Sequence, residues 1–377
     1  MTLRERDRRT PPGQVAADAD PGAVTRKAFD EAAQRAAATA MPTSGPLVDT
    51  FGRVHTDLRI SLTDRCNLRC TYCMPAEGLD WIPSTHLLSD AELIRLMRIG
   101  VTRLGITDIR FTGGEPLLAR HLESVVAGAA ALRPRPEIAL TTNGLGLARR
   151  AGALVEAGLD RINVSLDTVD RAHFAEITRR DRLPHVLAGL DAAARAGMTP
   201  IKVNAVLDPK ITGDDIVNLL HFCLQHGYQL RVIEMMPLDA DHRWTRDAGL
   251  DVDQVLEAVG ARFTLRRDAK PRGSAPAELW QVQEGPDTPA GTFGIIASVS
   301  RPFCGSCDRT RLTADGQIRN CLFATDESDL RALLRSGADD GAIEQAWRAA
   351  MWLKKAGHGI NDPNFIQPDR PMSAIGG

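Results

Sequence analysis

From Asp57 onward the chain alternates β-branched runs with amphipathic segments, and this alternation is the feature that most constrains its fold. The runs predicted as strands are 58–63, 108–112, 137–142, 161–167, 199–207 and 229–235. Helical segments such as 90–104 and 214–225 lie between them. Repeated strand–helix units with right-handed crossovers form a parallel sheet that curls toward a barrel. A complete barrel has about eight such units, so these six predict an α/β fold with a partial (β/α)6 barrel, open on one side.

The rhythm changes beyond Pro237, where shorter strands such as 291–300 precede two helices after Ser328. We therefore predict a barrel over residues 49–237 and an α+β extension over 238–377 that covers the open side. Residues 1–48 are rich in Ala, Arg, Asp and Pro and lack sustained apolar periodicity. They are predicted to be a mobile extension, in which a short helix at 28–38 is possible.

Composition excludes several classes of protein. The 377 residues are 43% hydrophobic and 25% charged, with a net charge of −2, so nothing global points to nucleic acid or to an acidic membrane. No apolar run approaches the ~20 residues of a membrane-spanning helix. Thr10-Pro11-Pro12-Gly13 follows Arg8-Arg9 where a secretion signal would be apolar. We expect a cytoplasmic protein, in which seven cysteines indicate metal or redox chemistry rather than disulfides.

Cys66, Cys70 and Cys73 form a C-x3-C-x2-C pattern just after the first predicted strand. Three thiolates on one loop can hold three irons of a [4Fe–4S] cluster, whereas clusters that only store electrons use four cysteines. The fourth iron is then open, as in catalytic rather than structural metal sites. The alternative is a zinc site with a distant fourth ligand, which the x3 spacing disfavours.

A second set of cysteines comprises Cys304, Cys307 and Cys321. It also counts three thiols, with no nearby histidine to complete a tetrahedral zinc site. Zinc with a fourth ligand from elsewhere in the fold stays an alternative here. The remaining cysteine, Cys223, lies among apolar residues of a predicted helix and is interpreted as a small core residue.

Small and polar residues follow the predicted strands at the ends where β/α barrels carry their chemistry. The second strand leads into Gly113-Gly114-Glu115-Pro116, whose glycines allow backbone groups to approach a ligand closely. Hydroxyl and amide side chains end the next two strands, at 141–144 and 163–167.

Basic residues lie on the predicted strands or beside the second cysteine set. They are Arg59, Arg110, Lys202, Arg231, Arg309 and Arg311. Because an unpaired guanidinium is costly to bury among helices, several of them are expected to face the barrel lumen. Together they would form a cage of forked donors suited to phosphates, although for any single arginine a surface ion pair is the alternative.

The two cysteine sets, Gly113-Gly114-Glu115-Pro116, Arg309-Thr310-Arg311 and the terminal Gly376-Gly377 resemble the GTP 3′,8-cyclase family of radical S-adenosylmethionine (SAM) enzymes. The resemblance covers about residue 49 to the C-terminus. It implies two [4Fe–4S] clusters, the first binding SAM at its open iron. It implies SAM contacts at Tyr72, Gly114, Ser165 and Met236. It also implies GTP contacts at Arg59, Arg110, Thr141, Lys202, Arg231, Arg309, Thr310 and Arg311, with Arg59, Arg309 and Arg311 as catalytic residues.

The implied reaction converts GTP to (8S)-3′,8-cyclo-7,8-dihydroguanosine 5′-triphosphate through a 5′-deoxyadenosyl radical, as the first step of molybdenum cofactor biosynthesis. The implied partners are a one-electron donor such as flavodoxin or ferredoxin and the next enzyme, cyclic pyranopterin monophosphate synthase. A homodimer is a possible assembly, and no nucleic acid or membrane partner is expected. In the family the Gly-Gly tail threads into the active site, and Asp108 stands where some relatives have a basic residue.

Two other functions remain open from the sequence. A radical SAM enzyme that modifies a peptide could carry an auxiliary cluster but would not need a phosphate cage. A non-enzymatic zinc-binding scaffold would hold zinc without iron.

Overall fold

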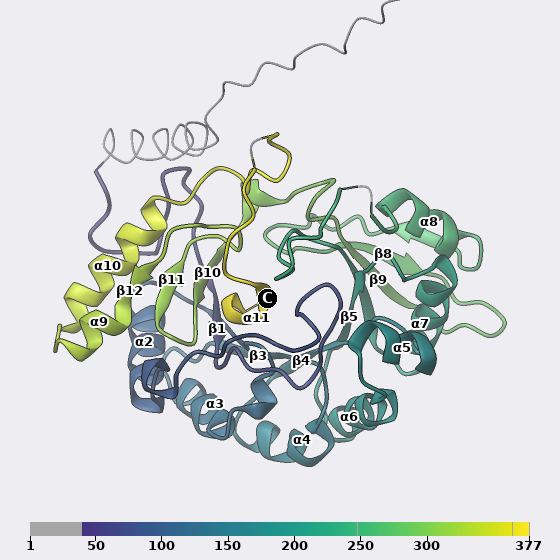
Figure 1. Ribbon diagram of the computed structural model, residues 1–377, viewed down its shortest axis with the longest axis horizontal. Coiled ribbons are helices and arrows are strands. Elements are labelled where there is room, and N and C mark those ends of the chain that lie inside the picture. Colours follow the sequence, from purple (N-terminus) through teal and green to yellow (C-terminus); the bar gives the residue numbers. More distant parts are fainter. Residues whose placement is uncertain (1–39, 247, 364, 377) are drawn as a thin grey trace, which may run out of the picture.

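The computed structural model describes residues 40–246, 248–363 and 365–376. Strands β1 to β6 pair in parallel and in chain order, and helices α2 to α7 surround them on the outside (Figure 1). The strands are β1 (Asp57–Ser61), β2 (Asp108–Thr112), β3 (Glu137–Thr142), β4 (Arg161–Ser165), β5 (Ile201–Leu207) and β6 (Gln229–Glu234). The helices are α2 (Asp90–Arg103), α3 (Leu122–Ala130), α4 (Leu147–Glu156), α5 (Arg171–Thr178), α6 (Leu183–Arg195) and α7 (Gly213–Gln225). The predicted partial barrel is confirmed.

The sequence pattern of the barrel strands explains how they position side chains. In β5 the burial alternates strictly, so that Lys202, Asn204 and Val206 share one face and four buried apolar residues share the other. Helix α2 begins at a capping box between Ser89 and Glu92. The apolar faces of the strands and helices meet in one continuous core, which is the layer between sheet and helices.

The residues after the barrel do not form a separate sheet. Strand β10 (Arg309–Leu312) pairs in parallel with β1, and β9 (Gly291–Ile296) pairs in parallel with β6, so the extension lengthens the sheet at both edges. The outer strands β7 (Leu265–Arg267), β8 (Glu278–Val282), β11 (Gln317–Arg319) and β12 (Ser328–Asp329) are antiparallel. Strand β9 is shorter than the predicted 291–300 because the chain turns after Ile296.

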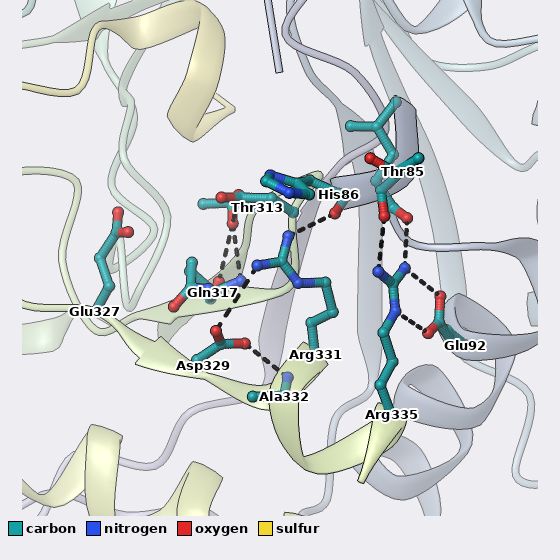
Figure 2. A network of polar contacts seen from close by, with 12 residues as sticks. Thr85, His86, Glu92, Thr313, Gln317, Glu327, Asp329, Arg331, Ala332 and Arg335 are labelled. Carbon is teal, nitrogen blue, oxygen red and sulfur yellow. Dashed lines mark hydrogen bonds and ion pairs between the residues drawn. The ribbon is translucent and has the colours of Figure 1, made fainter. Parts of the chain in front are cut away.

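Helices α8 (Val252–Gly260), α9 (Leu330–Arg335), α10 (Asp340–Trp352) and α11 (Met372–Ile375) complete the extension, and α9 and α10 confirm the two helices predicted after Ser328. Figure 2 shows how α9 attaches to the barrel. Arg335 donates to Thr85 O at 2.7 Å and pairs with Glu92 of α2 at 2.8 Å, while Arg331 donates to His86 O at 2.7 Å. Thr85 and His86 belong to the short helix η1 (Ser84–His86) that precedes α2.

The structure differs from the predicted mobile extension over residues 1–48 at the C-terminal end of that segment. Residues 1–39, including the possible helix at 28–38, lie outside the described residues. Leu47, however, is fully buried and its N–H donates to Leu104 O at 2.9 Å, while Arg348 donates to Gly45 O at 2.6 Å. The packed structure therefore begins before Asp49, because one isolated leucine can dock without any periodic pattern around it. In the described part of the chain no helix is both long and apolar enough to cross a membrane.

Candidate functional site

A cavity of about 290 Å³ lies inside the barrel at the C-terminal ends of its strands. Most of the predicted site residues line it together. They are Arg59, Cys66, Cys70, Tyr72, Cys73, Arg110, Gly114, Thr141, Ser165, Arg231, Met236, Arg309 and Arg311. The cavity thus joins the first cysteine loop at one end to a group of arginines at the other.

The first cysteine loop connects β1 to η1. Burial raises the pKa of the Cys66 thiol, and burial together with Cys66 raises that of Cys73 to about 12. For Cys70 burial raises the pKa further, aided by the Asp167 carboxylate and the neighbouring thiols. The sulfur of Cys66 accepts from Leu68 N at 3.4 Å. At Cys66 the nearby Arg69 guanidinium opposes the rise in pKa only in part. Because iron binds thiolates, a bound cluster would have to supply further positive charge to stabilise them.

Glu115 fixes the cysteine loop to β3. Its buried carboxylate accepts from Thr142 Oγ1 at 2.6 Å and from Asn143 N at 2.7 Å, and burial raises its pKa to about 7. The preceding Gly114 donates to Thr63 O at 2.6 Å, and a Cβ there would lie 2.3 Å from Arg65 O. The glycine was predicted to admit a ligand. It lines the cavity, but its closest approach is to the backbone of the cysteine loop.

Tyr72 ties the same loop to the barrel. Its hydroxyl donates to Asp167 Oδ2 at 2.9 Å, and Asp167 Oδ1 accepts from Val206 N at 2.8 Å. Burial raises the pKa of Asp167 to about 6. Asp167 was not predicted as a site residue. Its position, just beyond the end of β4, is the signal that could have identified it.

Five arginines form the second part of the cavity, here called the arginine cage: Arg59, Arg110, Arg231, Arg309 and Arg311. The Nε atoms of four of them, all except Arg311, are buried without a hydrogen-bond partner among the described residues. Burial and neighbouring guanidiniums lower the pKa of Arg110 to about 9, of Arg311 to about 9 and of Arg231 to about 10. The cage has two carboxylates close by, Asp57 at 3.6 Å from Arg59 and Asp308 at 3.5 Å from Arg309 Nε. Its excess of buried positive charge favours a polyanionic ligand.

Two predicted GTP contacts lie elsewhere. Thr310 points away from the cavity, because Trp347 Nε1 donates to its hydroxyl at 3.0 Å and the hydroxyl is fully buried against α10. Lys202 shares the lumenal face of β5 but does not line the cavity, and burial with the nearby Arg231 lowers its pKa to about 7. Asp108 lies at the start of β2, 3.8 Å from Arg161, away from the cavity lining.

The second cysteine set lies beside the arginine cage. Cys304 begins the short helix η3 (Cys304–Ser306), Cys307 follows it, and Cys321 comes after β11. Lys354, which is 3% exposed, donates to Cys307 Sγ at 3.3 Å and to Arg309 O at 2.8 Å. Burial raises the pKa of Cys307, but Lys354 and Arg309 outweigh it and bring the pKa down to about 7. Within the described residues no three His, Cys, Asp or Glu side chains are arranged to hold a single metal ion.

A buried network of ion pairs and hydrogen bonds contacts the backbone of the second cysteine set. Arg53 donates to Cys304 O at 2.7 Å and to Asp49 Oδ2 at 2.6 Å, and Asp49 also contacts His55 Nε2 at 3.0 Å. Sequence reasoning missed Lys354 and Arg53, and no motif marks either of them.

The C-terminal segment lies over the mouth of the barrel, where Figure 1 places α11 beside the end of the chain. The backbone of Ser373 hydrogen-bonds Cys73, and Arg311 Nη1 donates to Gly376 O. Gly376 has φ +82°, and a Cβ there would lie 2.8 Å from Thr112 Cγ2, so only glycine fits without strain. Gly377 lies outside the described residues.

Comparisons with known proteins agree with this arrangement. The family model of the Radical SAM superfamily matches residues 60–223, and that of Molybdenum Cofactor Synthesis C matches residues 228–360. The chain is 72% identical over 337 residues to a Mycobacterium tuberculosis protein named GTP 3′,8-cyclase 2, covering 89% of this chain and 94% of that one. It is also 72% identical to the Mycobacterium marinum GTP 3′,8-cyclase, covering 91% and 95%.

Among solved structures the chain resembles Streptococcus suis SuiB bound to S-adenosylmethionine. The TM-score is 0.53 at 15% identity, over 87% of this chain and 76% of that one. At this identity the likeness supports the fold alone.

Proposed function

The chain belongs to the GTP 3′,8-cyclase family of radical SAM enzymes, and from this we propose that it converts GTP to 3′,8-cyclo-7,8-dihydro-GTP in the first step of molybdenum cofactor biosynthesis. One observation carries the proposal. The same cavity is lined by three cysteines of one loop and by five arginines, four of which have buried Nε atoms without a hydrogen-bond partner among the described residues. A cluster-binding loop and a site for a polyphosphate therefore face each other across a single space.

The first cysteine loop fits an iron–sulfur cluster that binds SAM. Three thiols on one loop match a cluster with one open iron, and Tyr72, Gly114, Ser165 and Met236 line the cavity next to them. When bound there, the cluster and SAM together supply a carbon radical that can remove a hydrogen atom from ribose. The protein holds the loop in place through Glu115, whose N–H donates to Arg65 O at 2.7 Å, and through the Tyr72–Asp167 hydrogen bond.

The arginine cage would bind the triphosphate of GTP. Guanidiniums bind phosphate oxygens bidentately, and those with free Nε atoms have the donor positions to do so. Arg309 lies with its guanidinium 4.7 Å from the ring of Phe303, which keeps it on the cavity side of β10. Arg59, Arg309 and Arg311 are proposed to hold the phosphates so that the ribose faces the cysteine loop. Thr141 lines the cavity together with the arginine cage and the cysteine loop, and it would orient the sugar.

Cys304, Cys307 and Cys321 are proposed to hold a second [4Fe–4S] cluster. Lys354 supports this, because a buried ammonium at 3.3 Å from Cys307 stabilises the thiolate that iron requires. Such a cluster would supply a binding position for the guanine base and an electron for completing the product.

The remaining partners are proposed from the reaction. A one-electron donor such as flavodoxin or ferredoxin would reduce the first cluster, and cyclic pyranopterin monophosphate synthase would take the product. The free thiols of all seven cysteines suit a reducing compartment such as the cytoplasm. A homodimer stays a prediction.

The test is anaerobic purification followed by iron and sulfide analysis and by product formation from GTP and SAM. We expect iron and sulfide for two clusters per chain, SAM cleavage, and cyclised product. Zinc without iron would establish the scaffold alternative. SAM cleavage without GTP binding in an equilibrium assay would instead favour a peptide-modifying enzyme.

A further inference from the structure

A second pocket, of about 270 Å³, lies on the outer side of the first cysteine loop. It is formed by Asn67 of that loop, by the short helix η2 (Pro116–Leu118), and by the N-terminal ends of α4 and α6. The proposed function assigns no role to any of these residues. The nearest residue with an assigned role is Cys66, which directly precedes Asn67 in the chain. We propose that this pocket is the docking site for an acidic one-electron carrier protein that reduces the first cluster. The inference rests on the proposed function, since only a redox reaction there requires an electron from outside.

The pocket is connected to the cluster-binding sulfur by short contacts. Asn143 donates to Asn67 Oδ1 at 2.7 Å and approaches Cys66 Sγ at 3.8 Å. Leu145, which lines the pocket, donates its N–H to Asn143 Oδ1 at 2.9 Å. Cys66 itself lines the central cavity on the other side. The cysteine loop therefore separates the SAM-binding cavity from the outer pocket, and a carrier seated outside would lie next to a cluster ligand.

The charge of the pocket defines the partner. Its basic lining residues are Arg149, Arg150, Arg182 and His185, and no carboxylate of the described chain lines it. Arg150 is paired with Glu123, and the Asp181 carboxylate lies close to Arg182 and His185. Arg149 and Arg182 are exposed on the surface, and the four basic residues leave the pocket with net positive charge. The N-terminal ends of α4 and α6 add partial positive charge to the same place. Such a surface attracts an acidic protein and repels a basic one.

An apolar contact point completes the surface. Leu118 is 43% exposed at the end of η2, beside Leu117 and Leu145. A small apolar centre with a charged rim is typical of weak, transient redox complexes. The pocket outside the second cysteine set is different, because Asp326 and Glu327 lie in it with Cys321 and offset the charge of Lys355.

The transfer balances without any further reactant. The reduced carrier loses one electron, and the cluster held by Cys66, Cys70 and Cys73 gains it, with no bond made or broken in this step. Electrostatic guidance to Arg149 and Arg182 would raise the association rate and make it fall with added salt.

The experiment uses flavodoxin as the acidic carrier and the double variant Arg149→Glu/Arg182→Glu. Both positions lie at helix N-terminal ends, where a glutamate complements the helix dipole, so the variant is expected to fold. Arg262→Glu/Lys270→Glu is the matched control, with the same change in net charge at exposed sites near α8 and β7, away from the pocket (Figure 1). Leu118→Gln tests the apolar contact without altering charge.

The first readout is binding of oxidised flavodoxin by calorimetry at low salt, which needs no turnover. We expect the Arg149/Arg182 variant to bind about tenfold more weakly, Leu118→Gln to bind more weakly, and the control to match the wild type. The second readout is 5′-deoxyadenosine formation, which should fall with reduced flavodoxin but not with dithionite.

Unchanged flavodoxin binding by the Arg149/Arg182 variant, or equal weakening by the control pair, would overturn the docking site. Absence of flavodoxin binding by the wild type would overturn it too. If dithionite drives no SAM cleavage in the wild type, the proposed function itself fails, and the calorimetry still decides the docking site separately.

Discussion

The two cysteine loops offer the same number of thiols, and burial raises the pKa of Cys304 as it raises that of Cys66, but the charges around Cys70 and Cys307 differ. Around Cys70, burial and the Asp167 carboxylate raise the thiol pKa, whereas Lys354 and Arg309 bring that of Cys307 down to about 7 despite its burial. The ligand count and the C-x2-C spacing are shared, so they do not determine this difference. The surrounding charges do, and they come from other elements of the fold.

The contrast indicates a division of labour. Cations beside an iron–sulfur site stabilise its reduced, more negative state, so the second cluster is expected to have the higher reduction potential. The first, whose sulfurs accept no hydrogen bond from a lysine or arginine side chain in the described part of the chain, is expected to be the stronger reductant. That order suits a first cluster that breaks SAM and a second that holds substrate.

The largest expected effect separates the loops by removing single ligands. Cys66→Ala, Cys70→Ala or Cys73→Ala should abolish SAM cleavage, because the first cluster is lost. Cys304→Ala, Cys307→Ala or Cys321→Ala should leave part of the cleavage and stop cyclisation. Cys223→Ala is the control, since Cys223 is buried in α7 outside both sets. The measurement is the amount of 5′-deoxyadenosine and of cyclised product formed by each variant. Intact cyclisation in a variant of the second set would refute the division of labour between the two clusters.

The next effect concerns the C-terminal segment, which contacts Cys73 of the first cysteine loop and Arg311 of the arginine cage. Deleting Gly376 and Gly377 should cut cyclisation severely while iron content and melting temperature stay nearly unchanged, because Gly376 O holds Arg311. Gly376→Ala should act in the same direction, since its Cβ would clash with Thr112. A peptide copying the final residues, added in trans, should restore part of the activity of the truncated enzyme. Full activity after truncation would contradict the role of this segment.

A smaller effect on ligand binding is expected for changes at Arg311 of β10. It tests whether this side of the cavity binds GTP and not SAM. Arg311→Ala should weaken GTP binding by about 10- to 100-fold, as expected for loss of charge-assisted hydrogen bonds worth about 1.5–3 kcal/mol, and should leave SAM binding nearly unchanged. Arg311→Lys should recover only part of the loss, because an ammonium cannot form the bidentate contact. Equilibrium binding of both ligands checks this, and equal weakening would indicate a folding defect instead.

The smallest effect is expected when the Lys354 ammonium is removed, which takes away the charge difference between Cys307 and the thiols of the first loop. In metal-free protein the Cys307 thiol should react with iodoacetamide along a pH profile centred near its pKa of about 7. Because the Lys354 ammonium stabilises the thiolate, Lys354→Met should raise the pKa and shift the profile to higher pH. Lys354→Arg keeps the charge and should shift it less. An unchanged profile in Lys354→Met would show that the ammonium does not set the contrast.

The sequence predicts the barrel and most of the cavity because strands alternate with period two. Arg59, Arg110 and Arg231 reach the lumen as that periodicity requires. Thr310 was assigned to GTP along with its neighbours, although a residue between Arg309 and Arg311 on one strand must face the other side. Lys354 could not be predicted, since either lysine of the Lys354-Lys355 pair after a helix looks like any surface residue until the fold buries Lys354 against Cys307.

The order of strands also affects how the chain is made. Among the described residues the β1 edge is covered only by β10 and the β6 edge only by β9, and both of these strands emerge late in synthesis. Until then each edge exposes unpaired N–H and C=O groups that could recruit another chain and aggregate. A truncated gene product ending at residue 237 should therefore require chaperones rather than behave as an independent unit. Covering the β1 edge also aligns Arg311 with Arg59, so a nascent chain acquires its polyphosphate site only as that exposed edge disappears.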